Sequence, residues 1–272
     1  MIATEARPLL LVGAGKMGGA MLDGWLARGL PGKAVVVADP AVDVDARVRW
    51  QAEGVSLSPA APEALAPSIV VLAVKPQIMG KVLPAVRPLK QDDSLVLSVA
   101  AGITLATLEA GLGPGRIVRS IPNTPAQIGK GVTVAVANAA VTGTDRAAVA
   151  SLLSAVGTVH FIEDEALMDA VTAVSGSGPA YVFHLVECLA AAGARAGLPP
   201  ALAMDLARQT VVGASALMEA TGEAPDTLRR NVTSPNGTTQ AALDVLMAGD
   251  GLSALMERAV AAATRRSREL GA

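Results

Sequence analysis

The feature that most constrains the fold is the alternation of short apolar runs with helix-like stretches in the first part of the chain. The runs are rich in Val, Leu and Ile, and the first three stop at Gly13, at Asp39 and at Lys75. Such runs are typical of strands buried on both faces of a parallel sheet. The predicted strands cover residues 8–12, 34–38, 68–74, 94–99, 116–119 and 132–136. Strands that alternate with helices predict an α/β fold with a doubly wound, mostly parallel sheet.

The strand pattern ends near Phe161, and the remaining chain is rich in alanine and helical in pattern. We therefore predict two domains, residues 1–162 with the sheet and residues 163–272 without strands. Apolar periodicity and breaking residues place the helices of the second domain. These predicted helices cover residues 164–174, 179–196, 200–220, 224–231 and 239 to the end.

One of these helices is apolar on nearly every side. The run from Tyr181 to Ala194 has only His184 and Glu187 as strongly polar members. A helix without a polar face is buried all round, and a domain of this size would struggle to bury several such helices alone. We therefore expect an obligate homodimer through the helical domain.

Composition excludes several classes of function. The chain has 272 residues with 24 acidic and 22 basic side chains, a net charge of −2, and only 2% aromatic residues. It therefore lacks a general attraction to nucleic acid or anionic membranes, and it has little surface for stacking bases. The single cysteine, Cys188, lies in an apolar run and is expected to be a small buried hydrophobe, so no metal site is expected. No apolar run is long enough to span a membrane and no signal peptide is recognisable, which predicts a cytoplasmic protein.

A glycine-rich loop follows the first predicted strand and opens a helix, with the sequence Gly13-Ala14-Gly15-Lys16-Met17-Gly18. Gly13 permits a tight turn, Gly15 lets the backbone approach a pyrophosphate, and Gly18 lets the helix lie close to the strand. The helix start at Lys16 and Met17 adds N–H groups and the positive end of a dipole. A lone motif of this kind also occurs in structural turns. After a buried strand and before a helix, it predicts a dinucleotide site.

Asp39 ends the second predicted strand and bears on the choice of cofactor. A carboxylate there accepts a hydrogen bond from a ribose 2′-OH and repels a 2′-phosphate, which favours NADH. Arg47 and Arg49 are close in sequence and could reach a 2′-phosphate, while Asp39-Pro40 also fits an ordinary turn. These residues favour NADH only slightly, and they are also compatible with NADPH as the cofactor.

Two further motifs follow predicted strands, at the edge of an open α/β sheet where ligands bind. They are Ala73-Val74-Lys75-Pro76-Gln77 and Arg119-Ser120-Ile121-Pro122-Asn123-Thr124-Pro125. The two prolines of the second motif fix a stiff, extended loop from which Asn123 can point at a fixed target. Each motif alone also fits an ordinary connection, with Lys75 solvated and Arg119 a surface charge.

Two motifs lie in the predicted helical domain. Ser175-Gly176-Ser177-Gly178-Pro179-Ala180-Tyr181 joins two helices, and its small residues permit close backbone approach. It lacks the spacing of a hydrolase nucleophile elbow and follows no strand. The second motif is Thr233-Ser234-Pro235-Asn236-Gly237-Thr238-Thr239, in which Asn-Gly permits positive φ before a helix begins. Free N–H groups and hydroxyls at this helix start suit a small carboxylate, although an ordinary helix cap has the same composition.

In this order and over nearly the full length, the motifs resemble those of pyrroline-5-carboxylate reductase, the last enzyme of proline biosynthesis. The two motifs of the helical domain are the most specific to that family. The resemblance implies a Rossmann-like domain followed by a helical dimerisation domain, with dimers that often assemble into decamers. It implies reduction of L-1-pyrroline-5-carboxylate to L-proline by NADPH or NADH.

The resemblance also implies roles for individual residues. Ser234, Gly237 and Thr238 take the substrate carboxylate, and Thr239, the expected catalytic residue, lies near the ring nitrogen. The strand end with Ala73, Val74, Lys75 and Pro76 and the loop with Asn123 flank the ribose and nicotinamide of the cofactor. There are two departures from the family pattern. Asn236 replaces the usual glycine, although Asn is the next-best residue at positive φ. Asp39 stands where members that use NADPH have a small or basic residue.

The implied substrate is a cyclic imine with a carboxylate, and it is a good hydride acceptor once its nitrogen is protonated. Little acid–base machinery is then needed, which fits a sequence without a credible catalytic His or Lys. A β-hydroxyacid dehydrogenase is the alternative enzyme, but it needs a lysine in the helical domain and no Lys follows Lys130. A nucleotide-sensing regulator is the alternative without catalysis. It would be expected to lose the chemistry of residues 233–239, which is intact apart from Asn236.

Overall fold

The computed structural model describes residues 3–271 and contains the predicted α/β sheet. Its strands lie in the order β3-β2-β1-β4-β5-β6-β7-β8. Every neighbouring pair is parallel except β6 and β7, which are antiparallel. The strands are β1 (Leu9–Val12), β2 (Val35–Ala38), β3 (Ser56–Ser58), β4 (Ile69–Leu72), β5 (Leu95–Ser98), β6 (Arg116–Pro122), β7 (Gly131–Ala137) and β8 (Gly157–Ile162).

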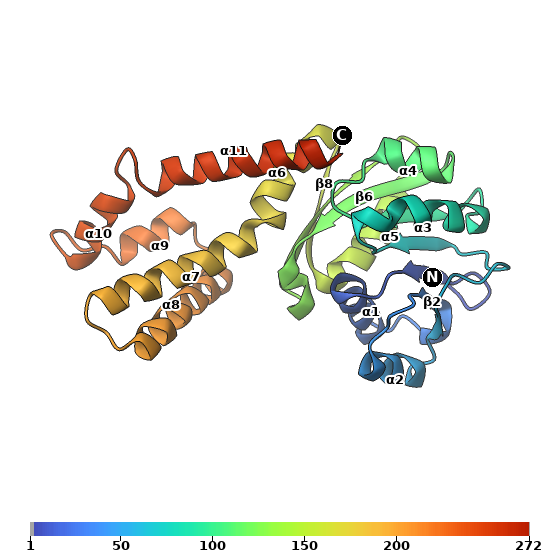
Figure 1. Ribbon diagram of the computed structural model, residues 1–272, viewed down its shortest axis with the longest axis horizontal. Coiled ribbons are helices and arrows are strands. Elements are labelled where there is room, and N and C mark those ends of the chain that lie inside the picture. The colour runs from blue at the N-terminus through green and yellow to red at the C-terminus, as the bar shows by residue number, and fades with distance from the viewer. Residues whose placement is uncertain (1–2, 272) are drawn as a thin grey trace. The chain divides into compact units, whose positions relative to one another are not determined.

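Helices cover both faces of this sheet (Figure 1), which confirms the doubly wound fold. Leu9 and Leu11 of β1 pack in one buried cluster, while Leu10 and Val12 pack in another, because successive strand residues face opposite sides. The first cluster contains residues of α1, α2 and α5, and the second contains residues of α3 and α4. These helices are α1 (Lys16–Ala27), α2 (Val44–Ala52), α3 (Met79–Val86), α4 (Leu105–Leu112) and α5 (Gly143–Leu153).

The two end strands of the sheet, β3 and β8, are absent from the predicted set. Both are less buried than the central strands, and β3 has the polar sequence Ser56-Leu57-Ser58. An edge strand is buried on fewer sides, so its sequence need not be a continuous apolar run. Its strand conformation depends on pairing with a neighbour: Val36 to Ala38 of β2 pair with β3.

The chain after β8 is helical, as predicted. The single helix predicted from residue 239 to the end is in fact two helices, which are separated after Leu246. The reason is local, because Gly251 lies against the end of α10, where an added Cβ would be 2.4 Å from the Leu246 carbonyl oxygen. A turn of π-helix, Thr172–Gly176, lies before the long helices. The helices are α6 (Met168–Val171), α7 (Gly178–Arg195), α8 (Pro200–Thr221), α9 (Pro225–Asn231), α10 (Thr238–Leu246) and α11 (Leu252–Gly271).

Contacts within the chain define two compact units. The sheet unit comprises residues up to Gly176 together with residues from Thr264 onward, and the helical unit comprises Ser177–Ala263. Side-chain bonds attach the segment after β8 to the sheet unit, since Glu165 accepts a hydrogen bond from the Leu105 N–H at 2.9 Å. The domain boundary after residue 162 stays a prediction.

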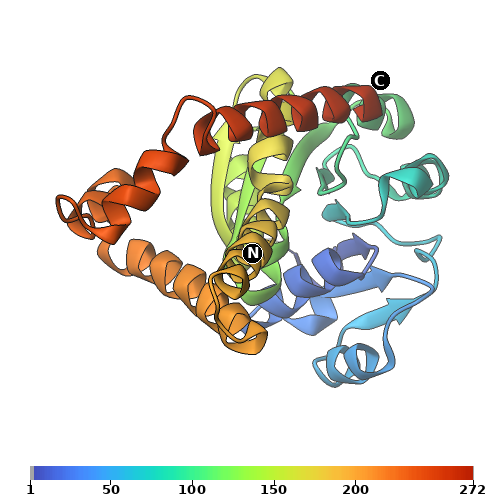
Figure 2. The ribbon, with the colours of Figure 1, turned by 60° about the vertical axis from the view of Figure 1, so that its left-hand side comes forward.

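In the helical unit α7 and α8 run along each other, as two views show (Figures 1 and 2). Its buried apolar residues, within residues 3–271, are only Ala190, Ala203 and Ala207. The prediction that Cys188 is buried is wrong for the single chain, where Cys188 is exposed. The helical unit also exposes many large apolar residues, among them Val182, Phe183, Leu185, Leu189, Leu202, Leu206, Val212, Leu217, Val245, Leu246, Met247 and Leu255.

No helix within residues 3–271 is both long enough and apolar enough to cross a membrane.

Candidate active site

The glycine-rich loop has the backbone that its sequence predicts. Gly13 has φ +92°, and a Cβ on it would lie 2.7 Å from the Ala73 carbonyl oxygen. A Cβ on Gly18 would lie 2.1 Å from the Gly13 carbonyl oxygen, so α1 can approach β1 only with glycine at 18. Gly15 has open space around its Cα and is the N-cap of α1, and no side chain caps that helix. The first N–H groups of α1, at exposed Lys16 and half-buried Met17, therefore suit an anion.

Asp39 lies directly after β2, and its carboxylate bonds to backbone groups on both oxygens. Oδ2 accepts from the Ala14 N–H at 2.7 Å, and Oδ1 accepts from the Ala41 N–H at 2.7 Å. The Asp39 N–H itself donates to the Ser58 carbonyl oxygen at 3.0 Å. Asp39 thus connects the glycine-rich loop to the carboxyl ends of β2 and β3.

The end of β4 lies against the glycine-rich loop, as the sequence predicts. The Ala73 N–H donates to the Val12 carbonyl oxygen at 2.8 Å, and a Cβ on Gly13 would lie 2.8 Å from Val74 Cγ1. Lys75 is exposed and precedes a short 3₁₀ turn that begins at Pro76. The sheet therefore brings Gly13, Asp39, Ala73 and Val74 together.

Asn123 follows β6, whose carboxyl end lies at the same edge because β6 is parallel to β5. Its side-chain oxygen accepts from the Val132 N–H at 2.9 Å, which ties the loop to the start of β7. The 3₁₀ helix after it, Thr124–Ile128, packs against α1. The segment that follows Asn123 thus packs against the helix that the glycine-rich loop opens, and the Asn123 side-chain oxygen has a structural partner.

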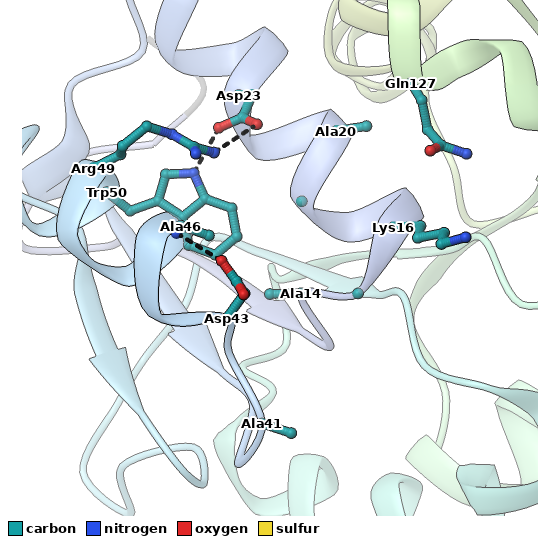
Figure 3. A pocket seen from close by; sticks show the side chains of 12 residues that line it. Ala14, Lys16, Ala20, Asp23, Ala41, Asp43, Ala46, Arg49, Trp50 and Gln127 are labelled. Atoms are coloured by element: carbon teal, nitrogen blue, oxygen red, sulfur yellow. Dashed lines mark hydrogen bonds and ion pairs between the residues drawn. The ribbon is translucent and has the colours of Figure 1, made fainter.

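A cleft of ≈ 380 Å³ lies beside the glycine-rich loop, between α1 and α2 (Figure 3). Trp50 Nε1 donates to Asp23 Oδ1 at 2.6 Å, and the Arg49 guanidinium lies 3.6 Å from the same carboxylate. Lys16 and Gln127 also line the cleft, apart from these three side chains in the view of Figure 3. Asp23, Trp50 and Gln127 are absent from the predicted site residues, because they lie on separate elements and no local motif marks them.

The alternative that Arg119 is a surface charge is wrong. Arg119 is only 4% exposed, and its Nη1 donates to Glu165 Oε1 at 2.7 Å. The Arg119 Nε atom is buried without a hydrogen-bond partner. Nothing in the sequence near Arg119 signals this burial, because the partner Glu165 is distant in sequence.

The loop before α10 forms a tight turn in which Asn236 has φ 58°. Within residues 3–271 it is the only non-glycine residue with positive φ, which confirms that asparagine takes the backbone shape usual for glycine. The Gly237 N–H donates to the Ser234 carbonyl oxygen at 3.1 Å. Proline at the second position and a positive φ at the third are the features of a type II turn.

Gly237 is the N-cap of α10, and no side chain caps this helix. Thr238, which is exposed, and Thr239, which is half-buried, are its first two residues. The turn thus places the Ser234 hydroxyl next to Gly237, where an added Cβ would lie 2.6 Å from Ser234 Oγ. Uncapped N–H groups with adjacent hydroxyls suit a small carboxylate, and the binding of one here stays a prediction.

Comparison with known proteins accounts for both units. A family model for pyrroline-5-carboxylate reductase dimerisation matches residues 165–270, and one described as NADP oxidoreductase, coenzyme F420-dependent, matches residues 9–102. A pyrroline-5-carboxylate reductase of Pseudomonas aeruginosa is 42% identical over 264 residues, which are 96% of each chain. The chain belongs to the pyrroline-5-carboxylate reductase family.

Solved structures of the family have the same fold. The chain is similar to a pyrroline-5-carboxylate reductase from Coxiella burnetii with a TM-score of 0.89 and 34% identity, over 98% of this chain and 99% of that one. It is similar to a pyrroline carboxylate reductase from Plasmodium falciparum, solved with NADP bound, with a TM-score of 0.81 and 30% identity. That match covers 99% of this chain and 100% of the other. The Rossmann-like sheet followed by a helical dimerisation domain is thus the architecture of the family.

Proposed function

We propose that this chain reduces L-1-pyrroline-5-carboxylate to L-proline with NADPH or NADH as the hydride donor. The observation that carries the proposal is the uncapped start of α10 behind the Ser234–Gly237 turn, in a chain 42% identical to a curated reductase. The NADP bound to the relative from Plasmodium falciparum supports NADPH as a donor.

The glycine-rich loop would hold the cofactor. Open space at Gly15 lets a pyrophosphate approach the N–H groups of Lys16 and Met17, while Gly13 and Gly18 keep the loop against Ala73. When bound, the cofactor would supply the hydride, and the residues that hold it would have to bring it within about 3–3.5 Å of the imine carbon. The protein's tasks are then to orient the reactants and to exclude water.

The start of α10 would hold the substrate. Ser234, Gly237 and Thr238 offer a hydroxyl and backbone N–H groups to the carboxylate, which the positive end of the helix dipole also favours. Thr239, one residue further, would form a hydrogen bond with the ring nitrogen. A protonated imine is already electrophilic, so this bond orients the ring and no further acid is required.

We also propose that the helical unit pairs with a second copy of itself. Its α7 exposes Phe183 at 64%, together with Val182, Leu185 and Leu189, and the matching family model is one for dimerisation. A dimer would remove these side chains from water, and each fully buried one is worth about 1.5–3 kcal/mol. Assembly into a decamer and a cytoplasmic location stay predictions from the family resemblance and the composition.

The oligomer is tested by the molar mass in solution. We expect a dimer or a multiple of it for the wild type, and a smaller species for Phe183→Glu. The control is Val48→Glu, since Val48 is equally exposed at 62% but lies on α2 of the sheet unit. A monomeric wild type, or a control that dissociates as fully as Phe183→Glu, would contradict the proposal.

Activity is tested by mixing the protein, the imine and either reduced cofactor, and by following the loss of absorbance of the reduced nicotinamide. We expect oxidation of the cofactor that depends on the imine, with L-proline as the product. Binding of cofactor without turnover with either one would instead favour a nucleotide-sensing regulator.

A further inference from the structure

We propose that Asp39 is a positioning residue, which holds the glycine-rich loop for either cofactor and does not select NADH over NADPH. The inference rests on the proposed function, because it concerns how that cofactor is bound. A carboxylate at the end of the second strand of such folds ordinarily binds the ribose 2′-OH, and its charge repels a 2′-phosphate. The bonds of Asp39 point to a different task.

Both oxygens of the carboxylate have short bonds to backbone donors. Oδ2 accepts from the Ala14 N–H and Oδ1 from the Ala41 N–H, each at 2.7 Å. Bonds to an ionised acceptor are the stronger class of protein hydrogen bond. Asp39 is also half-buried, so its carboxylate is not simply a solvated group that turns toward a ligand.

The bond to Ala14 acts on the part of the loop that a cofactor needs. Ala14 lies between Gly13, which is packed against Ala73, and Gly15, which has open space and begins α1. Packing fixes Gly13, and the Asp39 carboxylate fixes the next peptide group. The direction of the following N–H groups, at the start of α1, therefore depends on Asp39.

The end of β2 is itself anchored. The Asp39 N–H donates to the Ser58 carbonyl oxygen of β3 at 3.0 Å, and the Gly13 N–H donates to the Ala38 carbonyl oxygen at 3.0 Å. The side chain of Asp39 thus transmits the fixed geometry of β2 and β3 to the loop. A ligand that carries a pyrophosphate benefits from this geometry whether or not its ribose carries a 2′-phosphate.

Two substitutions distinguish positioning from ribose recognition. Asp39→Asn keeps the shape but replaces one acceptor by an NH₂ group, so one of the two bonds is lost. Asp39→Glu keeps the charge, but its longer side chain cannot keep both bonds. Asp164→Asn is the control, because the Asp164 carboxylate also accepts from a backbone N–H, that of Ala166 at 2.9 Å, far from the loop in sequence.

The measurement is the Kd of the wild type and each variant for NADH and for NADPH, by cofactor fluorescence. We expect both Kd values to rise by about tenfold in both Asp39 variants, the effect of one charged hydrogen bond, with their ratio nearly constant. We expect the control to bind both cofactors like the wild type. If Asp39 instead recognised the ribose, Asp39→Asn would raise the Kd for NADH and lower the Kd for NADPH, while Asp39→Glu would leave the Kd for NADH unchanged. That pattern, or unchanged Kd values, overturns the inference.

Amide hydrogen exchange in the wild type covers the case in which the variants fail to fold. The Ala14 amide should exchange slowly without cofactor, because Asp39 already binds it, and rapid exchange overturns the inference. A wild type that binds both cofactors but does not turn over the imine would reject the proposed reaction and leave the role of Asp39 testable by the same Kd values.

Discussion

Gly237 lies so close to Ser234 that a Cβ on residue 237 would be 2.6 Å from the Ser234 hydroxyl oxygen. The backbone angle does not require glycine there, since φ is −83°. A larger residue there would displace the Ser234 hydroxyl, because the turn folds the serine side chain over the start of α10. This close approach is what sets a hydroxyl beside the free N–H groups of a helix start.

Gly237→Ala should therefore raise the KM for the imine. The added methyl group moves the Ser234 hydroxyl or the turn, and a shift of about 1 Å at a reactive site can cost about a hundredfold in rate. Steady-state kinetics with the imine varied give the result, and Gly249→Ala is the control because nothing lies within 4 Å of its added Cβ. Equal kinetics for the two variants would contradict the assignment of the turn to the substrate.

Asn236 separates the backbone requirement from the side chain. Asn236→Gly should keep kcat/KM within about twofold, because glycine adopts positive φ without strain. Asn236→Ala should lower the free energy of unfolding by about 1 kcal/mol and raise the KM for the imine, because a left-handed backbone is unfavourable for alanine. Urea denaturation and kinetics on both variants test this. Loss of activity in the glycine variant would show that the amide side chain itself contributes.

Thr239→Ala should lower kcat/KM by about tenfold to a few hundredfold, if one hydrogen bond to the ring nitrogen is lost in the transition state. Thr239→Ser retains the hydroxyl and should recover most of the activity. Thr221→Ala serves as the control, because the Thr221 hydroxyl bonds to the Leu217 carbonyl oxygen at the end of α8. Wild-type kinetics in Thr239→Ala would remove Thr239 from the mechanism.

Glu165→Ala should destabilise the sheet unit. It leaves the Arg119 guanidinium, which is 4% exposed, without its carboxylate partner, and it removes the acceptor for the Leu105 N–H. Breaking a buried pair costs about 3–5 kcal/mol, and we expect about 2 kcal/mol because the Glu165 side chain is 29% exposed. Urea unfolding measures the difference. If Glu165→Ala lowers the free energy of unfolding no more than Glu163→Gln, which breaks an exposed ion pair, the pair of Arg119 and Glu165 stabilises the fold little.

The exposed pair of Arg146 and Glu163 predicts a pH dependence. Two hydrogen bonds from Arg146, at 2.8 and 2.9 Å, lower the pKa of the Glu163 carboxyl from its usual 4.5. A lowered pKa in the folded state gives stability that is present above pH 4.5 and is lost as the pH falls through the folded value. The Tm difference between wild type and Glu163→Gln should thus be small and should vanish in acid. A Tm difference that grows as the pH falls would contradict this prediction.

The local conformation of the motifs could be predicted in large part, because each motif acts within a few neighbouring residues. Gly18 meets the Gly13 carbonyl oxygen within one strand–turn–helix unit, and Gly237 meets Ser234 within a single turn. In such segments the allowed backbone angles and the size of each side chain decide the conformation. The break after α10 was equally local, since Gly249-Asp250-Gly251 is a turn sequence that the helical prediction overlooked.

The sequence by itself determined the central strands, the glycine-rich loop, the helical second half and the turn before α10. Only the tertiary structure decided that Asp39 bonds to Ala14, that Arg119 is buried beside Glu165, and that β3 joins the sheet edge. The physical reason is that periodicity and turn residues act over a few neighbouring residues. A carboxylate or guanidinium, in contrast, is placed by whichever distant backbone or charge the packed strands bring within hydrogen-bonding distance.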